Sequence, residues 1–475
     1  MNQRNQSLFA LVLTLLFLIV APLMILYALG YRLAPPEEGF RVSINPTGGI
    51  RVSTRSPYNV TLDGERLERS PVFKLGLEPG TTQVTLSQPG FQSWEKTLEI
   101  EPYLVTLVDS VILFPTEPEI TQITDLNNVT EVVANPLSDN ILYSSQSEDD
   151  PGLWLYNPQT GTTSQLVDSL EIDGSVSQEY QDITWDESGQ QVLFRANILN
   201  QDQFFIISNA LSPDPAITNI SELFPYNLDQ APVEIVELTG NTLTFIQGGH
   251  IFQIDLVEQE RSEILVSNVA TADLVGNILY YVNTKENDIR AFNTLALTEE
   301  IVLEDQWEQP IASIQIPSTE THILVFLDDQ SVYWQDLIEP EAEFGLLEGV
   351  SANKALFGAE DKKALLVGEN QVNILYLDTF DGYQNKTEGD LDQIYASDLQ
   401  LSEMRYFGPT QEHVTFIEDG ILKVVELDAR STPNVYELGA AEDYSDVLVG
   451  NQAVFVIHRE DMLYRFEFPF RRGLF

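Results

Sequence analysis

The pattern of apolar and polar positions changes abruptly near residue 30 of the chain. No residue from Leu8 to Leu29 is charged, and Pro22 lies inside this run. As a helix, these 22 residues would extend about 33 Å, roughly the thickness of a membrane's hydrocarbon core. The run is longer than the apolar core of a secretory signal peptide, and no A-x-A cleavage site follows it. Residues 1–32 are therefore predicted to form an N-terminal tail and an uncleaved transmembrane helix, 8–29.

The charges beside this segment indicate its direction. Arg4 and the terminal amine precede the helix and Arg32 follows it, whereas acidic residues contribute little to the positive-inside rule. We expect a single-pass protein of the cell membrane, with a cytoplasmic N-terminus and extracytoplasmic C-terminal domains. Residues 33–48, which include two adjacent prolines, are predicted to be a linker.

Residues 49–115 consist of short alternating segments separated by turn signals. Val60-Thr61-Leu62 runs into Asp63-Gly64, a strong hairpin turn, and Pro79-Gly80 and Pro89-Gly90 mark two further turns. Several such strands within about 65 residues predict a small β-sandwich.

These residues resemble the PEGA domain family. The matching elements are Ser56-Pro57, Val60-Thr61-Leu62-Asp63-Gly64, Ser70-Pro71, Leu77-Glu78-Pro79-Gly80, Pro89-Gly90-Phe91 and Trp94. Ser70, Phe91 and the pair Tyr58-Asn59 depart mildly from the family pattern. The resemblance implies an extracytoplasmic β-domain of bacterial surface and membrane-anchored proteins, and it implies no catalytic activity.

A pair of apolar strands recurs eight times in the rest of the chain, at a spacing of about 44 residues, as in four-stranded propeller blades. The first member of each pair lies at 141–143, 192–194, 243–245, 278–280, 324–326, 364–366, 414–416 and 453–455. The second lies at 153–156, 204–207, 251–254, 289–292, 332–334, 372–375, 422–425 and 463–466. The overall fold class is therefore all-β, with a β-propeller over residues 118–475. Eight blades are expected, and seven are the alternative if one copy is not a full blade.

Two turns before these strands add a resemblance to known propellers. Pro136–Asn140 and Asp186–Gly189 are similar to the S-P-D-G turn of TolB-type and WD40-like propellers. A ring must close, because an open ring would leave unpaired strand edges. The last repeat has about three strands before the chain ends, so segment 120–124 is predicted to supply the outer strand of the last blade.

Composition excludes several classes of function. The formal charge is −49, from 73 acidic and 24 basic residues. A nucleic-acid partner would require clustered Lys and Arg, so none is expected. The chain has no cysteine, which excludes disulfides, thiolate metal sites and cysteine nucleophiles.

The sequence contains no G-x-S-x-G motif, no phosphate-binding glycine loop and no H-E-x-x-H motif. Its four histidines, His250, His322, His413 and His458, lie in four different repeats without metal-ligand spacing and are expected in loops or at strand ends. Acid pairs such as Asp149/Asp150 and Asp390/Asp392 arise by chance at this acidity. Calcium binding at 147–150 or along 381–392 is conceivable, but no EF-hand loop supports it. No catalytic, cofactor-binding or metal-binding residue is assigned, no cofactor is expected, and the ligand-binding residues stay unknown.

Aromatic residues divide into two groups. Trp154, Trp185 and Trp334 fall on predicted strands and should pack between blades. Phe224-Pro225-Tyr226 and Tyr383 fall in longer segments, where they either pack locally or project toward a partner.

The function expected from the sequence is that of a non-enzymatic, membrane-anchored scaffold or recognition protein of the cell envelope. Its propeller face would bind a protein or a cell-envelope glycan. One alternative is an envelope hydrolase that uses propeller-face carboxylates. Another is a structural envelope protein without a specific ligand. Fold alone does not choose among them, and the oligomeric state stays open.

Overall fold

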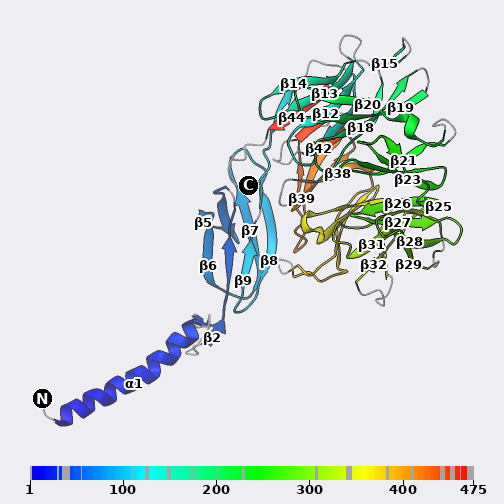
Figure 1. The fold of residues 1–475 in the computed structure, drawn as a ribbon. Coiled ribbons are helices and arrows are strands. Elements are labelled where there is room, and N and C mark those ends of the chain that lie inside the picture. The colour runs from blue at the N-terminus through cyan, green and yellow to red at the C-terminus, as the bar shows by residue number, and fades with distance from the viewer. Residues whose placement is uncertain are drawn as a thin grey trace.

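A helix, a small β-domain and a ring of β-sheets follow one another along the chain (Figure 1). The computed structural model describes residues 3–28, 31–34, 43–54, 56–109, 111–123, 128–146, 151–168, 170–172, 175–177, 179–198, 201–226, 231–304, 307, 309–338, 345–380, 385–407, 411–438, 444–449, 455–459 and 462–467.

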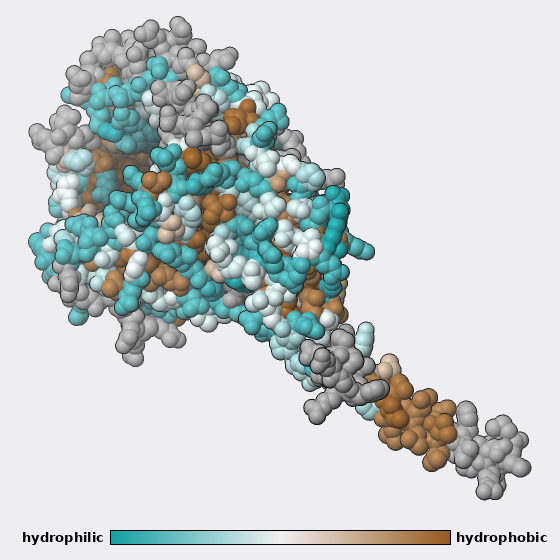
Figure 2. Space-filling model, turned by 180° about the vertical axis from the view of Figure 1, so that it is seen from behind, coloured by the Kyte–Doolittle hydropathy of each residue, from teal (hydrophilic) through white to brown (hydrophobic). Residues whose placement is uncertain are grey.

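The N-terminal helix α1 (Gln3–Ala28) includes Pro22 and projects away from both β-domains (Figure 1). Large apolar side chains are exposed along it, from Leu11 to Tyr27. Figure 2 shows this segment as the largest concentration of hydrophobic surface in that view. Among the described residues, no helix combines the length and the hydropathy that crossing a membrane requires.

A short strand pair that the sequence did not predict overlaps the expected linker, 33–48. Strands β1 (Tyr31–Ala34) and β2 (Ser43–Pro46) pair antiparallel. The Tyr31 and Tyr103 hydroxyls lie 2.7 Å apart, so β1 also contacts the small β-domain. Each of these strands has only four residues, which is the lower limit for recognising an alternating pattern.

The small β-domain is a sandwich of two sheets, as predicted. The three-stranded sheet has the order β6-β3-β9, in which β3 and β9 run parallel, and the four-stranded sheet has the order β5-β4-β7-β8. The strands are β3 (Gly48–Val52), β4 (Asn59–Leu62), β5 (Glu65–Arg69), β6 (Val72–Leu77), β7 (Gly80–Ser87), β8 (Trp94–Ile100) and β9 (Val105–Val108).

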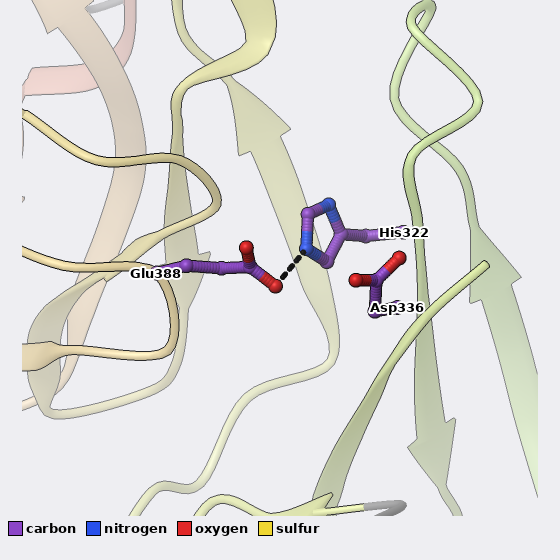
Figure 3. A group of neighbouring side chains, drawn as sticks. All are labelled: His322, Asp336 and Glu388. Atoms are coloured by element: carbon purple, nitrogen blue, oxygen red, sulfur yellow. Dashed lines mark hydrogen bonds and ion pairs between the residues drawn. The ribbon is translucent and has the colours of Figure 1, made fainter. Parts of the chain in front are cut away.

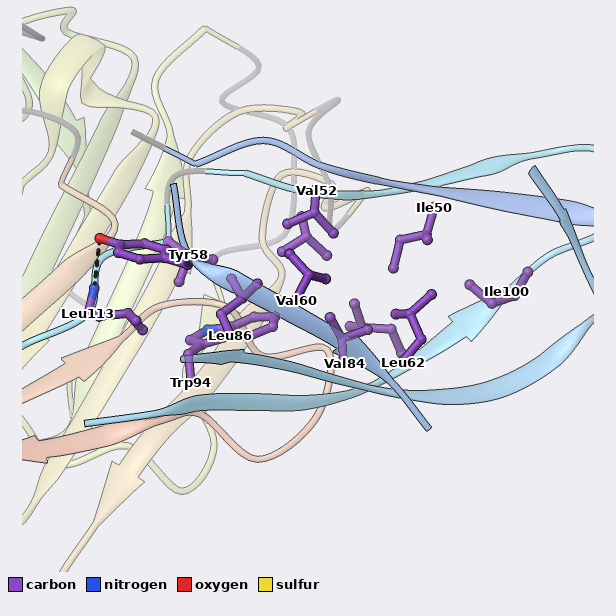
Figure 4. Close-up of a cluster of buried hydrophobic side chains, with 13 residues drawn as sticks. Ile50, Val52, Tyr58, Val60, Leu62, Val84, Leu86, Trp94, Ile100 and Leu113 are labelled. Atoms are coloured by element: carbon purple, nitrogen blue, oxygen red, sulfur yellow. Dashed lines mark hydrogen bonds between the residues drawn. The ribbon is translucent and has the colours of Figure 1, made fainter. Parts of the chain in front are cut away.

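Alternating residues of both sheets form the core of this domain (Figure 4). Along β8, every second side chain is buried, beginning at Trp94 and ending at Ile100. The Asp63-Gly64 turn has positive φ at both residues, 47° and 82°, as the predicted hairpin requires. The Leu113 amide donates to the Tyr58 hydroxyl at 3.5 Å and so ties the end of the domain to its core.

Eight further antiparallel sheets of four or five strands, numbered here as blades 1–8 in chain order, follow in the described residues. Their first strands are β11 (Val129–Ala134), β17 (Tyr180–Trp185), β21 (Val233–Thr239), β26 (Val269–Val275), β30 (Ile311–Gln315), β34 (Lys354–Phe357), β38 (Leu401–Phe407) and β42 (Tyr444–Val449). Their second strands are β12 (Ile141–Ser145), β18 (Val192–Ile198), β22 (Thr242–Gln247), β27 (Ile278–Asn283), β31 (His322–Leu327), β35 (Lys363–Val367), β39 (His413–Glu418) and β43 (Phe455–Arg459).

The third and outer strands complete each blade. The third strands are β13 (Gly152–Asn157), β19 (Gln201–Ser208), β23 (His250–Asp255), β28 (Asp288–Asn293), β32 (Val332–Asp336), β36 (Gln371–Tyr376), β40 (Ile421–Glu426) and β44 (Met462–Glu467). The outer strands are β14 (Thr162–Val167), β20 (Ala216–Asn219), β24 (Glu260–Arg261), β29 (Thr298–Leu303), β33 (Gly345–Leu346), β37 (Leu391–Ala396), β41 (Val435–Glu437) and β10 (Glu119–Gln122). Smaller elements are β15 (Leu170–Ile172), β16 (Ser175–Ser177), β25 (Val266–Ser267) and the 3₁₀ turns η1 (Ser221–Leu223) and η2 (Ala359–Asp361).

The ring closes as the sequence predicted. Strand β10, which precedes blade 1 in the chain, pairs antiparallel with β44 and becomes the outer strand of blade 8. The first strands of blades 1 and 8 are also neighbours. The recurring apolar pairs of the sequence fall on the second and third strands of the blades, apart from 453–454, which lie outside the described residues.

Hydrophobic cores lie between adjacent blades. One cluster joins blades 1 and 2 and contains Trp185, and another joins blades 5 and 6 with Trp334 packed against it. Trp154 packs against the cluster that joins blade 1 to Leu463 of blade 8. The three tryptophans therefore pack between blades, as expected. Second strands such as β12, β31 and β39 are buried on both faces, so each reads as a continuous apolar run.

Two faces of the ring must be distinguished. One face carries two turns of each blade: the turn from the first to the second strand and the turn from the third to the fourth. We call it the proximal face, because the small β-domain contacts it. The distal face carries the turns from second to third strand and the connections between blades. Side chains link neighbouring turns on the proximal face: Asn135 of blade 1, for example, donates to the Gly189 carbonyl of blade 2 at 2.8 Å.

Candidate functional site

The small β-domain docks on blade 7 through a buried ion pair. Lys96 on β8 and Glu426 at the end of β40 lie 2.6 Å apart, and their side chains are 0% and 5% exposed. The Trp94 indole also donates to Glu426, at 2.5 Å, and the Lys96 ammonium donates to the Asp428 carbonyl. Burial raises the pKa of the Glu426 carboxyl, while the nearby ammonium opposes part of this rise.

Two further contacts extend this interface. Arg430 donates to the Leu107 carbonyl of the small β-domain at 2.7 Å, and its guanidinium is held by Asp428. Phe114, at the end of the small β-domain, is fully buried against Phe407 and Tyr436 of blade 7, with ring centroids 5.4 and 4.8 Å away. The interface therefore combines an aromatic core with fully desolvated charges.

The turn that carries Arg430 is one of several similar turns on the proximal face. In five blades, the third strand ends at or just before an Asp or Asn whose side-chain oxygen accepts the backbone N–H two residues further on. Such bonds stabilise a tight turn. The five residues are Asn157, Asp255, Asn293, Asp336 and Asp428.

The residue two positions after this Asp or Asn points outward and differs among blades. In blade 7 it is Arg430, which contacts the small β-domain. In blades 3, 4 and 5 it is Val257, Leu295 and Ile338, which are 64%, 75% and 69% exposed. Single exposed apolar residues are ordinary. Three at the same position of consecutive blades form a regular surface, which we call the apolar turn row.

A group of carboxylates lies near the same face, contributed by blades 2, 3 and 4. Burial and the neighbouring Glu187 carboxyl raise the pKa of Glu237 to about 7, with a smaller contribution from Asp273. Burial also raises the pKa of Asp273, although the Ile316 amide of blade 5 donates to its carboxyl at 2.7 Å. None of these three acids forms a salt bridge with another described residue. Asp273 thus links two blades, and Glu237 is poised to bind a proton near neutral pH.

His322, Asp336 and Glu388 form a second mixed group between blades 5 and 6 (Figure 3). His322 opens β31, Asp336 closes β32, and Glu388 lies in the turn before β37. One ligand atom from each residue lies within 4.8 Å of the other two. His322 is buried, and its Nε2 lies 3.2 Å from a Glu388 oxygen. The chemistry of this donor set, one imidazole and two carboxylates, suits a divalent metal ion.

Three of the four histidines lie at strand ends, as expected from the sequence. His250, His322 and His413 are the first residues of their strands. The side chain of His458 lies outside the described residues. The group around His322 was missed because its members come from three separate turns. Glu388 does fall within segment 381–392, one of the two segments where the sequence makes calcium binding conceivable.

The structure describes some of the acid pairs and loop aromatics that the sequence singled out. Asp392 pairs with Lys386 at 2.6 Å, and Asp390 accepts the Thr387 amide at 2.8 Å. Phe224 is buried in the core between blades 2 and 3, whereas Tyr226 is 42% exposed near His250. Segment 147–150 and residues 381–384, which include Tyr383, lie outside the described residues.

Comparisons with known proteins agree with both β-domains. Residues 47–112 match the PEGA domain family. The chain is similar to the C-terminal WD40 domain of Sif2, with a TM-score of 0.51 and 12% identity over 74% of this chain and 99% of that one. It is also similar to the β-propeller domain of Cps50 (Swd1) from Myceliophteria thermophila (TM-score 0.41, 11% identity, 74% and 99% covered).

A third similar structure is the complex of KlAtg21 with the coiled-coil of AgAtg16 (TM-score 0.44, 12% identity, 65% and 98% covered). No curated protein matches the chain. The chain therefore contains a PEGA domain match, followed by an all-β ring with the fold of a WD40-type β-propeller.

Proposed function

We propose that this chain is a non-enzymatic protein-interaction scaffold, attached to a membrane and located outside the cytoplasm, whose propeller binds a protein through the apolar turn row. The observation that carries this proposal is the recurrence of Val257, Leu295 and Ile338 at one exposed position of three consecutive blades. Exposed apolar side chains at regular positions are what a protein partner buries on binding.

The fold supports this reading, since a propeller is a rigid ring that presents its turns on two faces. Blade 7 supplies an internal example, because Arg430 at the equivalent position contacts the PEGA domain. A cell-envelope glycan is the alternative ligand. Glycan recognition would depend on hydrogen-bonding groups and stacked aromatic rings more than on valine, leucine and isoleucine.

The experiment is affinity capture with the detergent-solubilised full chain from membranes of its own cells. A specific protein should be captured by the wild type and lost with the triple variant V257E/L295E/I338E. The matched control is L399E, since Leu399 is 48% exposed on the distal face. Capture that survives the triple variant and fails with L399E would contradict the assignment of the face, and binding of wall polymer alone would favour the glycan.

Membrane attachment through segment 8–29 is part of the proposal. Its support is the uncharged sequence and the exposed apolar side chains of α1. The chain should stay with membranes during alkaline extraction, and deletion of residues 1–28 should release it. Protease added to intact cells should remove the propeller if it lies outside the cytoplasm, and protection in sealed cells would overturn that location.

Hydrolysis by face carboxylates is a second candidate, favoured by the raised pKa of Glu237 beside Glu187 and Asp273. We place it second because Asp273 is engaged by the Ile316 amide and no hydrolase motif accompanies the group. Its test is hydrolysis of cell-wall polymer by the full chain. Activity that E237Q abolishes would establish this function in place of the scaffold.

A further inference from the structure

We propose that His322, Asp336 and Glu388 bind one divalent transition-metal ion at the junction of blades 5 and 6, with Zn²⁺ as the best-matched ion. Zinc takes imidazole nitrogen and carboxylate oxygen at about 2.0–2.2 Å, commonly with three protein ligands and a fourth position for water or a partner. The three side chains supply this set from rigid strand ends and a tight turn (Figure 3).

The spacing of the donor atoms fits this assignment. Two ligands on one tetrahedral zinc ion lie about 3.3 Å apart, given bond lengths near 2.0–2.1 Å. The His322 Nε2 and the Glu388 oxygen are 3.2 Å apart, which matches such an edge. One oxygen of Asp336 lies within 4.8 Å of one ligand atom of each of the other two residues. It must therefore approach by less than about 2 Å, which a side-chain rotation can supply.

The surroundings orient the ligands before any metal binds. His322 and Asp336 are directly opposite each other in the register of β31 and β32. The His322 Nδ1 lies 2.9 Å from the Thr321 hydroxyl, and its ring stacks on Trp334 with centroids 5.6 Å apart. With the Nδ1 proton donated to Thr321, the Nε2 lone pair faces the group. A second partner of this kind is usual for metal-binding histidines.

Glycine at position 389 brings Glu388 to the site. Its φ is +81°, and a Cβ atom there would lie only 2.8 Å from the Trp334 ring. Only glycine therefore lets this turn approach Trp334 so closely. The Gly389 amide donates to the Tyr376 carbonyl at 2.8 Å, which fixes the turn. The neighbouring Glu388 carboxylate is thereby held against His322.

Charge also favours a cation. Within the described part of the chain, Glu388 pairs with His322 and with no lysine or arginine. The two carboxylates together carry the negative charge that one divalent ion neutralises.

The test uses the full chain in detergent, stripped with a chelator and dialysed against ZnCl₂ at physiological salt. We expect one tightly bound zinc per chain, and at least a tenfold loss of affinity in E388Q. Glu388 is 43% exposed, so this variant should fold normally. The matched control is E360Q, another exposed glutamate of blade 6, which pairs with Lys362 at 3.3 Å and should bind zinc as the wild type does.

Co²⁺ in place of Zn²⁺ distinguishes a built site from weak binding on an acidic surface. A four-coordinate site with one nitrogen ligand should give an intense visible d–d band that E388Q and H322Q abolish. Surface carboxylates leave Co²⁺ six-coordinate and pale. Zinc affinity unchanged in E388Q, or a Co²⁺ spectrum that stays pale, would overturn the site and leave His322 and Glu388 as an ion pair.

Discussion

Blade 7 and blades 3–5 have the same kind of turn on the proximal face, but the turn is covered in blade 7 and exposed in blades 3–5. In blade 7, the turn after Asp428 is covered by the PEGA domain, and Arg430 donates across the interface to Leu107. In blades 3–5, the equivalent turns carry exposed Val257, Leu295 and Ile338. One set of turns has its partner within the chain, and the other has apolar side chains exposed to solvent.

The difference shows how docking changes the chemistry of this face. Where the turn is covered, charges are paired and removed from water, as for Lys96 and Glu426. Where it is exposed, the position is apolar in three consecutive blades. Internal docking therefore combines an aromatic core with specific buried polar contacts, and the proposed external docking depends on apolar burial alone.

The largest expected effect is at the covered turn. K96M should lower the free energy of unfolding by about 3–5 kcal/mol, because it leaves the Glu426 carboxylate buried without its cation. Urea unfolding of the full chain in detergent would measure it. K74M is the control, since Lys74 and Glu65 form an exposed pair at 3.5 Å that should contribute at most about 1 kcal/mol. Equal losses in both variants would contradict a special role for the interface.

A smaller effect is expected for W94F. This variant keeps an aromatic ring in the core and removes the indole N–H that donates to Glu426 at 2.5 Å. Leaving a buried carboxylate oxygen unsatisfied should cost about 1–3 kcal/mol. When W94F is added to K96M, the additional loss of unfolding free energy should differ from the loss that W94F causes alone, because both groups act on the same carboxylate. Strict additivity in a double-mutant cycle would show that the contacts are independent.

We expect the free energy of unfolding to depend on pH because of Glu237, which lies away from the covered turn. Its pKa is raised to about 7, so the folded chain holds a proton that the unfolded chain releases near its ordinary pKa. The associated stability is present at low pH and is lost as pH rises from about 4.5 through 7. Solvent screens this half-buried group, so the loss should be only about 1 kcal/mol. E237Q should flatten the stability profile over this range, and a profile identical to the wild type would contradict the assignment.

The smallest effect on stability is expected at the exposed turns. Each substitution in V257E/L295E/I338E should change the free energy of unfolding by no more than about 0.5 kcal/mol, because the side chains are exposed and support no core. Thermal and urea unfolding would measure it. A loss of several kcal/mol would show that the apolar turn row supports the fold, and the row would then no longer stand as a docking surface.

Much of the fold follows from local patterns in the sequence. Second strands such as β31 and β39 are buried along their whole length and so appear as apolar runs. First strands are harder to recognise, because bulges interrupt their register. In β21 the register shifts between Ile235 and Glu237, and in β17 between Gln181 and Thr184. Such shifts break the period of two on which strand prediction depends.

The candidate sites follow from the sequence only in part. The apolar turn row could have been found by aligning the repeats on the Asp or Asn after each third strand. The metal-binding group leaves no spacing signal, since Glu388 lies in a different blade from His322 and Asp336. The ion pair of Lys96 and Glu426 is equally hidden, because it joins residues 330 positions apart whose proximity depends on how the two domains dock.

Site-specific photo-crosslinking in intact cells tests the central claim most directly. A benzophenone amino acid would replace Leu295 in the apolar turn row or Leu399 on the distal face, in the otherwise unaltered full chain. The account predicts a crosslinked product with one defined protein from position 295 and none from position 399. Crosslinking from position 399 alone, or from neither position while the partner is still captured, would contradict binding through the apolar turn row.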